Sequence, residues 1–573
     1  MDELEAQSKK LKQLVGKYDP DVFVGRITTL IKTITMPSQK HIYAGLISPF
    51  RQLIYLMNLN LTSPIEEVKD LDFPQRDWDG IKAYLRSINT IYDQTYGEQK
   101  VLSQHLDEEQ FVRNAVSLST YTAFFHQGPL KFEEQVIEKI LRVFKNIHQE
   151  LEAELGLNPA DFIAIYDELD KLCHRKLNRA WDRENKEENE YLDSIQSGIK
   201  LGKYSFREGM ATVGEKDMEL MQALTNPAAS HYFSLADLEG KCGTEKLAKF
   251  LSYFSLRREH NERFLYFSGA NQLLKKPIYR MGDGQYLVID YKVLLDAIYE
   301  FLTVTAKSIL KDSNRITRVR DKYLELKVTE LFKDFYSRDK GARFYENFHV
   351  DGSEHDLLIL SGKTAIIVEV KAGNIREPTF DPGRAYDKIK KDFNNTIGYG
   401  YEQTFKIKEF FLDRANFDIT DDENVFLETI DTRPFKQVFS VVVTLEKFGH
   451  IQNDLSKMLS LFEDDRYPWS VCLDDMEIFL LAMKNKNMTI ADFHLFLNLR
   501  QNLHANLQAN DEGRVTGYFL SHKNFLKMRK THGKYNPVLD DDLIYDNLYK
   551  KVLGFKDERN VEFKTNPGYI HLM

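Results

Sequence analysis

The chain of 573 residues is longer than a single hydrophobic core supports, so we expect about two to four domains. Hydrophobic residues make up 42% and charged residues 29% of the sequence, a composition that excludes disordered and fibrous proteins. The net charge of −9 argues against a protein that coats nucleic acid non-specifically, but it is compatible with a locally positive cleft.

Cysteine usage and the N-terminal sequence indicate the cellular compartment. The three cysteines, Cys173, Cys242 and Cys472, lie far apart, which argues against a disulfide framework or a zinc knuckle and favours a reducing compartment. The N-terminal segment is charged and lacks the apolar core of a signal peptide. No apolar run approaches the roughly 18 residues needed to cross a bilayer. The sequence therefore predicts a cytoplasmic protein with no membrane segment.

Residues 1–235 are predicted to form a helical region of unknown role. Apolar residues recur there at intervals of three and four, as in the segment 132–148, which we expect to be one helix. Arg142 and His148 on this segment resemble the Arg-His pair of HEPN ribonucleases, although Val143 stands where that family favours a polar residue.

Residues 236–314 are predicted to be a connector that contains a β-hairpin. Two short β-prone runs flank Gly282-Asp283-Gly284, a sequence typical of a tight turn. A helix is expected to follow over residues 291–312.

Helices and strands alternate from residue 315 to about 530, which predicts an α/β domain. We assign residues 531–573 to a C-terminal extension. The predicted strands of the α/β domain cover residues 343–346, 356–360, 364–371, 437–444 and 469–473.

Charged residues converge where two of these strands meet. The strands at 356–360 and 364–371 flank a Ser-Gly-Lys turn and should pair antiparallel. Because side chains alternate along a strand, Glu369 and Lys371 point to the same face. Pairing across the turn brings Asp356 to the same end of the hairpin.

The surroundings of these charges favour a metal site. Residues 365–368 are apolar on both faces, which is typical of a strand covered on both sides, where charges are costly unless they are paired or bound to a cation. The carboxylates of Asp356 and Glu369, with the backbone carbonyl of Val370, suit Mg²⁺, for which Mn²⁺ is the expected substitute. The metal would polarise a phosphate and acidify water, and Lys371 could orient or deprotonate that water.

The pattern resembles the PD-(D/E)xK nuclease superfamily, with Asp356 as the aspartate and Glu369-Val370-Lys371 as the ExK tripeptide. His355 stands where the motif has proline, and we expect it to face away from Asp356 as a structural residue. The resemblance implies a restriction-endonuclease-like domain, with a central mixed sheet flanked by helices, inside a multidomain α+β chain. It also implies that Asp356 and Glu369 ligate the metal while Lys371 assists the attacking water.

Two flanking helices offer further candidates that the resemblance suggests. Many family members carry a glutamate on the helix before the sheet. In this chain that helix has an apolar stripe, and Glu325 lies at its border, whereas Glu330 should be exposed. The stripe is formed by Leu324, Val328, Leu331, Phe332 and Phe335. Gln403 shares a helix face with Ile407 and Phe411, where related nucleases carry a glutamine that positions the substrate or the lysine. A solvated glutamate and a satisfied buried amide are the structural alternatives.

The resemblance implies Mg²⁺-dependent hydrolysis of phosphodiester bonds, with DNA favoured over RNA and 5′-phosphate ends as products. A homodimer would allow both strands to be cut, and analogy suggests a role in bacterial restriction or anti-phage defence. Three alternatives stay open: the same domain cutting RNA, a HEPN-type ribonuclease in the helical region, and a non-catalytic scaffold that binds nucleic acid or protein.

Overall fold

The computed structural model divides the chain into two compact units. Unit 1 comprises residues 1–91, 128–310 and 561–573, and unit 2 comprises residues 92–127 and 311–560. The structure describes residues 2–34, 39–65, 68, 75–96, 108–125, 132–181, 197–198, 201, 203, 226–312, 314–377, 382–509, 511–525, 527–531, 533–537 and 543–559.

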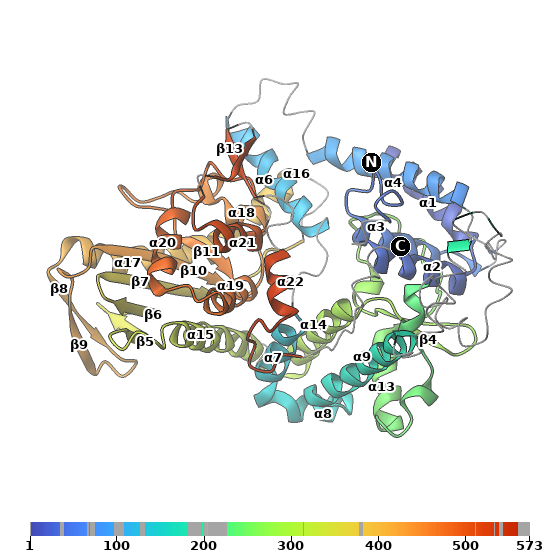
Figure 1. The fold of residues 1–573 in the computed structure, drawn as a ribbon, viewed down its shortest axis with the longest axis horizontal. Helices are drawn as coiled ribbons and strands as arrows, with labels where there is room; N and C mark the ends of the chain where they lie inside the picture. The colour runs from blue at the N-terminus through green and yellow to red at the C-terminus, as the bar shows by residue number, and fades with distance from the viewer. Residues whose placement is uncertain are drawn as a thin grey trace. The chain divides into compact units, whose positions relative to one another are not determined.

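Unit 1 is mainly helical, as predicted for the N-terminal region (Figure 1). Helices α2 and α14 begin at aspartates, Asp19 and Asp290, whose side chains accept hydrogen bonds from backbone N–H groups of the first turn. The helices are α1 (Asp2–Gly16), α2 (Pro20–Thr33), α3 (Pro49–Leu61), α4 (Gln75–Tyr96, whose end belongs to unit 2), α7 (Glu133–Val143), α8 (His148–Leu155), α9 (Pro159–Trp181), α13 (Thr244–Phe254) and α14 (Tyr291–Ile309), with short helices η3 (Lys145–Ile147), η4 (Pro227–His231), η5 (Leu235–Leu238) and η6 (Gln272–Leu274).

A four-stranded sheet in the order β1-β4-β3-β2 completes unit 1. The predicted hairpin is confirmed, because β3 and β4 pair antiparallel across a turn in which Gly284 adopts a φ of 89° that favours glycine. Strand β2 pairs parallel with β3 and forms one edge of the sheet. The strands are β1 (Tyr232–Phe233), β2 (Ser255–Leu256), β3 (Ile278–Arg280) and β4 (Tyr286–Val288).

Unit 2 contains a mixed seven-stranded sheet in the order β11-β10-β7-β6-β5-β8-β9. Strand β10 runs parallel to both β7 and β11, and the remaining neighbours are antiparallel. The strands are β5 (Arg343–Val350), β6 (Ser353–Ser361), β7 (Thr364–Lys371), β8 (Asn416–Thr420), β9 (Phe426–Asp431), β10 (Gln437–Thr444) and β11 (Trp469–Cys472), with a separate pair β12 (Arg529–Thr531) and β13 (Lys534–Asn536).

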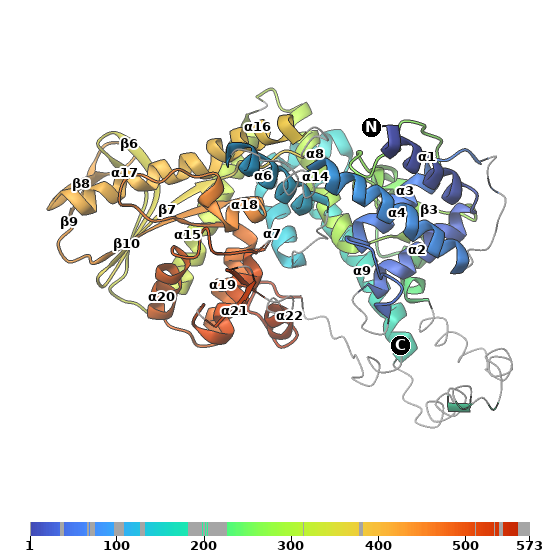
Figure 2. The ribbon, with the colours of Figure 1, turned by 90° about the horizontal axis from the view of Figure 1, so that it is seen from above.

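Helices cover both faces of this sheet, so its central strands are buried (Figure 2). Helix α17 packs Ile407 and Phe411 against Leu358 and Ile367 on one face, and α15 and α19 pack on the other. The prediction of a mixed sheet flanked by helices is confirmed. The helices of unit 2 are α6 (Glu108–Phe125), α15 (Arg315–Phe335), α16 (Pro382–Phe393), the π-helix η7 (Asn394–Gly398), α17 (Tyr399–Asp413), α18 (His450–Asn453), the short helix η8 (Leu455–Lys457), α19 (Leu473–Asn485), α20 (Ile490–Arg500), α21 (Glu512–His522) and α22 (Leu543–Tyr549).

None of the helices in the described part of the chain combines the length and the apolar composition that crossing a lipid bilayer requires.

The divisions between the two units differ from the predicted domain boundaries at 235/236, 314/315 and 530/531. Strand β1 precedes the first of these boundaries but pairs with β4, so the predicted connector is part of unit 1. Helix α6 lies in the predicted helical region, yet its Val116 belongs to a core cluster of unit 2 together with Ile389 of α16 and Ile451 of α18. The division into two units is decided by packing between segments that are distant in the sequence, and the periodicity of apolar residues within a segment does not predict such packing.

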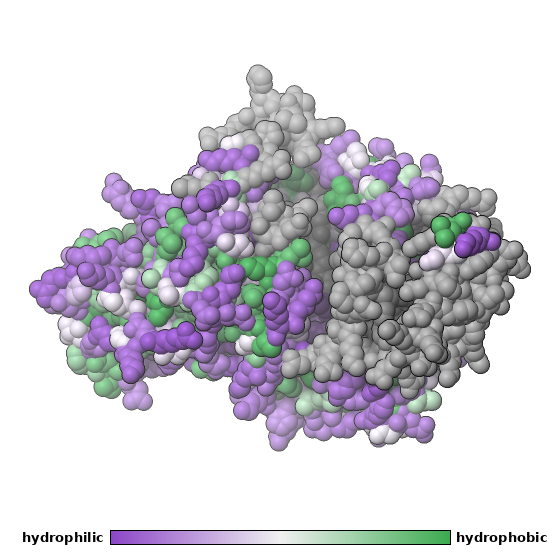
Figure 3. All heavy atoms as spheres, viewed as in Figure 1, coloured by the Kyte–Doolittle hydropathy of each residue, from purple (hydrophilic) through white to green (hydrophobic). Residues whose placement is uncertain are grey.

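The five strands predicted between 343 and 473 are present, and the prediction missed the hairpin of β8 and β9. This hairpin ends the sheet, and β5 pairs with β8 at a single position, His349 opposite Thr420. Val425, Phe426 and Leu427 are exposed at its turn, where Figure 3 shows apolar side chains. Half-exposed edge strands lack the apolar run that indicates a central strand.

The close contact between α6 and the start of α18 can be tested at Gly449. This glycine has a φ of 65°, and a Cβ atom there would lie 2.6 Å from Cβ of Ala123 on α6. We expect Gly449→Ala to lower the free energy of urea-induced unfolding by about 1–3 kcal/mol more than Gly362→Ala does. Gly362 controls for the positive φ alone, because it has a φ of 57° and no atom within 4 Å of the added Cβ, whereas the ψ of −143° at Gly449 adds a backbone cost of its own. Equal effects of the two substitutions would contradict the packing of α6 in unit 2.

Candidate active site

Two adjacent strands bring Asp356, Glu369 and Lys371 together at one end of the sheet. The antiparallel register of β6 and β7 pairs Leu357 with Val368, so Asp356 and Glu369 follow at the end of this ladder. The Lys371 Nζ atom lies 2.8 Å from Oε2 of Glu369 and 3.5 Å from Oδ2 of Asp356. The predicted convergence of two acids and one amine is therefore present.

Backbone groups at the end of β7 complete the arrangement. The N–H of Val370 donates a hydrogen bond of 2.7 Å to Oδ2 of Asp356. On the other side of β7, towards β10, the carbonyl of Lys371 accepts a hydrogen bond from the backbone N–H of Leu445. Because the N–H and C=O of one residue point to the same side of a strand, the Val370 carbonyl is also directed towards β6. The ladder with β6 has ended there, so this carbonyl lies beside the carboxyl group of Asp356.

Burial controls the electrostatics of the three groups. The side chain of Glu369 is 1% exposed, and those of Asp356 and Lys371 are each 17% exposed. Burial, together with the neighbouring Glu369 carboxylate, raises the pKa of Asp356 to about 7. Burial also raises the pKa of Glu369. Burial by itself would lower the pKa of Lys371, but the two carboxylates outweigh it and raise that pKa. The lysine is therefore held as a cation between two costly buried acids.

His355, which we expected to face away from Asp356 as a structural residue, lies against Glu369. Its Nδ1 lies 3.0 Å from Oε1 of Glu369, and burial lowers the pKa of the imidazole to about 4. A neutral imidazole at this distance donates Nδ1–H to the carboxylate.

The position of His355 follows from a break in strand alternation. Asn347, on the neighbouring strand β5, has a φ of 46°. Tyr345 and Phe348 on either side of it pack in the same core cluster, although strict alternation would send them to opposite faces. His355 pairs with Phe348, and their ring centroids lie 5.5 Å apart in a tilted arrangement, so His355 shares the face of that cluster.

Helix α17 approaches the site closely because it begins with glycines. A Cβ atom on Gly400 would lie 2.8 Å from Cγ1 of Val442 and 3.5 Å from Cγ of Lys371. The π-helix η7 directly precedes α17, and such π-turns are frequent at functional sites. Tyr399, which is half exposed, places its ring centroid 5.6 Å from Lys371 Nζ. Tyr399 was not among the site residues predicted from the sequence, although two glycines, Gly398 and Gly400, flank it there.

Gln403 lies on α17 one turn beyond Gly400 and Tyr399. Its Oε1 atom is buried and, among the described residues, has no hydrogen-bond partner. A satisfied amide was the structural alternative for this residue, and the orphaned oxygen does not fit that alternative. Gln403 stays a candidate for contact with a ligand of the site.

On α15, Asp321 is electrostatically coupled both to Glu325 and to the site. Burial raises the pKa of Asp321, and both Asp356 and Lys371 contribute to its electrostatic surroundings. Glu325, one turn later, accepts a hydrogen bond of 3.1 Å from Lys322, and Glu330 is exposed as predicted. The sequence signal for Asp321 was its four-residue spacing from Glu325, which places both on one helix face.

The donor set fits a hard divalent cation. Asp356, Glu369 and the Val370 carbonyl all supply oxygen, which is the ligand atom that Mg²⁺ and Mn²⁺ prefer. No group of three or more His, Cys, Asp or Glu side chains suited to a metal occurs in the described ranges. A cation here would thus depend on two carboxylates together with a backbone oxygen and, as is usual for Mg²⁺, bound water.

The HEPN alternative requires Arg142 and His148 on one helix, and the structure separates them. Helix α7 ends at Val143 and α8 begins at His148, so the prediction of a single helix over 132–148 is wrong. Arg142 pairs with Glu138 at 2.9 Å, and Nδ1 of His148 lies 2.6 Å from the Lys145 carbonyl oxygen. Both side chains make local helix contacts.

Residues 320–444 match the family model of the nuclease-related domain, NERD, which belongs to the PD-(D/E)xK-like nuclease superfamily. No curated protein and no solved structure matches the chain significantly. The matched segment extends from α15 through β10 and contains Asp356, Glu369 and Lys371, so the resemblance to the superfamily is confirmed.

The contact between His355 and Glu369 can be measured by a double-mutant cycle. We expect His355→Leu to lower the free energy of unfolding by about 1–3 kcal/mol, because a buried carboxylate oxygen loses its donor. In a Glu369→Met background the same substitution should cost less, as measured by urea-induced unfolding. An equal cost in both backgrounds would show that the hydrogen bond does not stabilise the site.

Proposed function

We propose that the nuclease-related domain of this chain hydrolyses phosphodiester bonds in nucleic acid with Mg²⁺ as its cofactor, and that it acts as an endonuclease on DNA. The single observation that carries the proposal is the ammonium group of Lys371, which is hydrogen-bonded to two buried carboxylates just beyond the end of the β6–β7 ladder. Buried charges of this density at the end of a central strand are costly, and such groups cluster at functional sites.

Asp356, Glu369 and the Val370 carbonyl would hold the cation. Bound Mg²⁺ supplies Lewis-acid polarisation of the phosphate and makes water easier to ionise. Within the protein, His355 fixes Oε1 of Glu369 and leaves Oε2 directed at Lys371. The Val370 N–H fixes Asp356 in the same way. Both carboxylates are therefore oriented before any ligand arrives, which lowers the cost of binding.

Lys371 is proposed as a donor that orients water and stabilises negative charge on the phosphate. The two carboxylates raise its pKa, so it stays protonated and is poorly suited to act as a base. Tyr399 lies beside this ammonium and is half exposed, which suits it to contact a sugar or base of the substrate strand. Gln403 would use its free oxygen on the cation or on the substrate.

RNA cleavage by the same residues is the second candidate, because two carboxylates and a lysine do not distinguish the sugars of DNA and RNA. A non-catalytic scaffold is the third, because a nuclease fold can persist without activity. Homodimerisation would allow double-strand cutting, and a place in bacterial restriction or anti-phage defence rests on analogy alone.

Plasmid cleavage tests the proposed function directly. We expect cleavage in Mg²⁺, none in EDTA, and a loss of at least about a hundredfold in rate for Lys371→Ala and for Glu369→Ala. Lys363→Ala is the matched control, because Lys363 is an exposed lysine at the turn of the same hairpin, and its activity should equal that of the native protein. Structured RNA is assayed in parallel. Cleavage that survives in both EDTA and Lys371→Ala would remove the proposal.

A comparison of two acids on α15 tests which of them supports the site. We expect Asp321→Asn to lower the cleavage rate by about tenfold or more and to raise the Mg²⁺ concentration needed for half-maximal rate. Glu325→Gln should have a smaller effect, because Glu325 is engaged by Lys322. A larger loss for Glu325→Gln would instead support the glutamate expected from the superfamily.

A further inference from the structure

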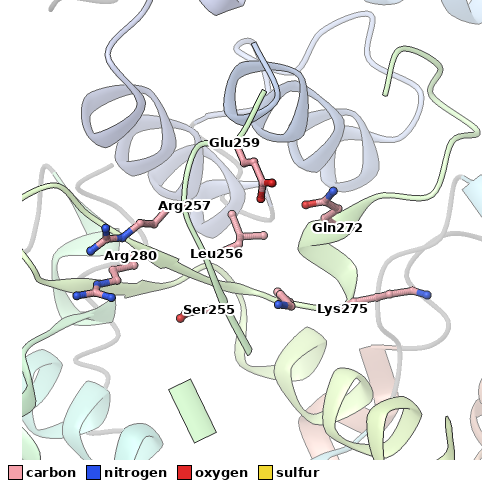
Figure 4. A pocket seen from close by; sticks show the side chains of 8 residues that line it. Ser255, Leu256, Arg257, Glu259, Gln272, Lys275 and Arg280 are labelled. Atoms are coloured by element: carbon pink, nitrogen blue, oxygen red, sulfur yellow. The ribbon is translucent and has the colours of Figure 1, made fainter. Parts of the chain in front are cut away.

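Unit 1 contains a pocket that is separate from the nuclease-related domain. It has a volume of about 560 Å³ and lies at the β2 edge of the four-stranded sheet (Figure 4). Pockets between about 300 and 1,000 Å³ suit small molecules. The lining residues are Ser255, Leu256, Arg257, Glu259, Gln272, Lys275, Lys276 and Arg280.

The lining is strongly cationic. Arg257, Lys275, Lys276 and Arg280 are opposed by a single acid, Glu259. The chain as a whole has a net charge of −9, so this concentration of positive charge is not a reflection of composition. Leu256 is the one aliphatic residue of the lining, which argues against a ligand that is mainly apolar.

The two arginines are neighbours across a pair of parallel strands. Leu256 of β2 pairs with Tyr279 of β3, and Arg257 and Arg280 directly follow that pair. Figure 4 shows both guanidinium groups on the same side of the pocket. Like charges at adjacent strand positions repel each other, unless an anion lies between them.

Few carboxylates neutralise these cations. Lys275 has Glu300 at 3.6 Å, in an exposed pair. For Arg257, Lys276 and Arg280, no acidic side chain within ion-pairing distance occurs among the residues described, and Arg280 lies 5.8 Å from the ring centroid of Tyr286. Three guanidinium and ammonium groups are thus available to a ligand.

The wall that carries Arg257 and Glu259 is held rigidly by the residue between them. The guanidinium of Arg258 donates hydrogen bonds to four backbone carbonyls, those of Gly16, Tyr18, Ser63 and Pro64, at 2.6–3.2 Å. The N–H of Glu259 donates to the Leu61 carbonyl at 2.9 Å. Because side chains alternate along an extended chain, anchoring Arg258 in the protein directs Arg257 and Glu259 to the pocket.

The opposite wall is fixed in a similar way. Asn271 donates to the Ile54 carbonyl and accepts from the N–H of Leu273, whose side chain is buried. The backbone N–H groups of Lys275 and Lys276 both donate to the Gln272 carbonyl. Both walls therefore present their polar groups on an ordered backbone, so little backbone entropy would be lost on binding.

We propose that this pocket binds a small organic phosphate of nucleotide size. Arg257, Lys276 and Arg280 would bind the phosphate oxygens through charge-assisted hydrogen bonds, with the planar guanidinium groups suited to bidentate contacts. Glu259 and Gln272 would accept hydrogen bonds from hydroxyl or amino groups of the ligand. A carboxylate in a cationic pocket weakens the binding of a bare anion, so its presence favours a ligand that also carries hydrogen-bond donors. This ligand site is independent of the proposed nuclease activity.

Calorimetric titration of the full chain in EDTA tests the proposal, with ADP, inorganic pyrophosphate, adenosine and a single-stranded DNA oligonucleotide as probes. We expect ADP and pyrophosphate to bind and adenosine not to bind. The double variant Arg257→Glu/Arg280→Glu should weaken ADP binding by about tenfold or more. Arg263→Glu, a charge reversal of an exposed arginine outside the pocket, should leave binding unchanged.

Equal ADP binding by the native protein and the double variant would overturn the proposal. A failure of the native protein to bind ADP would also overturn it, even where the oligonucleotide binds and the double variant weakens that binding. Hydrogen exchange on the native protein gives a second measurement that needs no variant. Addition of ADP should slow exchange in residues 255–259 and 272–280, and unchanged exchange there would also overturn the proposal.

Discussion

The candidate active site depends on the cost of placing charges at the end of a buried strand. Glu369 is almost fully enclosed, and burial raises the pKa of both carboxylates. Lys371 offsets this cost with its own charge, and the Val370 N–H and His355 supply hydrogen bonds. Removing one partner from such a group leaves another buried charge uncompensated, so these residues act as one unit.

The same constraint recurs at the neighbouring strand ends. Lys447, just after β10, lies 2.8 Å from Asp475 and 3.3 Å from Asp511, and all three side chains are largely buried. Since β7, β10 and β11 run parallel, their carboxyl ends meet at one edge of the sheet. At β7 the two carboxylates lie beside the end of the β6–β7 ladder, where the Val370 N–H already orients Asp356.

The helices around the sheet support the site by close approach. Gly400 allows α17 to contact Val442 and the stem of Lys371, and Gly373 allows the loop after β7 to pass against Thr396 of η7. These contacts fix the surroundings of Lys371 on rigid elements, which is where catalytic geometry is best maintained. Unit 1 shows the same principle in its pocket, where the anchored Arg258 positions two neighbouring side chains that are exposed to a ligand.

The sequence by itself determined the local features. Alternation placed Glu369 and Lys371 on one face, the Ser-Gly-Lys turn paired β6 with β7, and apolar periodicity marked α15 and α17, because these patterns arise from neighbours within a few residues. Only the tertiary structure decided that Asn347 breaks the alternation and brings His355 to Glu369, that Asp321 on α15 is coupled to the site, and that α6 belongs to unit 2. It alone brought Arg257 and Arg280 together, 23 positions apart. These outcomes depend on packing between distant segments, whose energies no local pattern records.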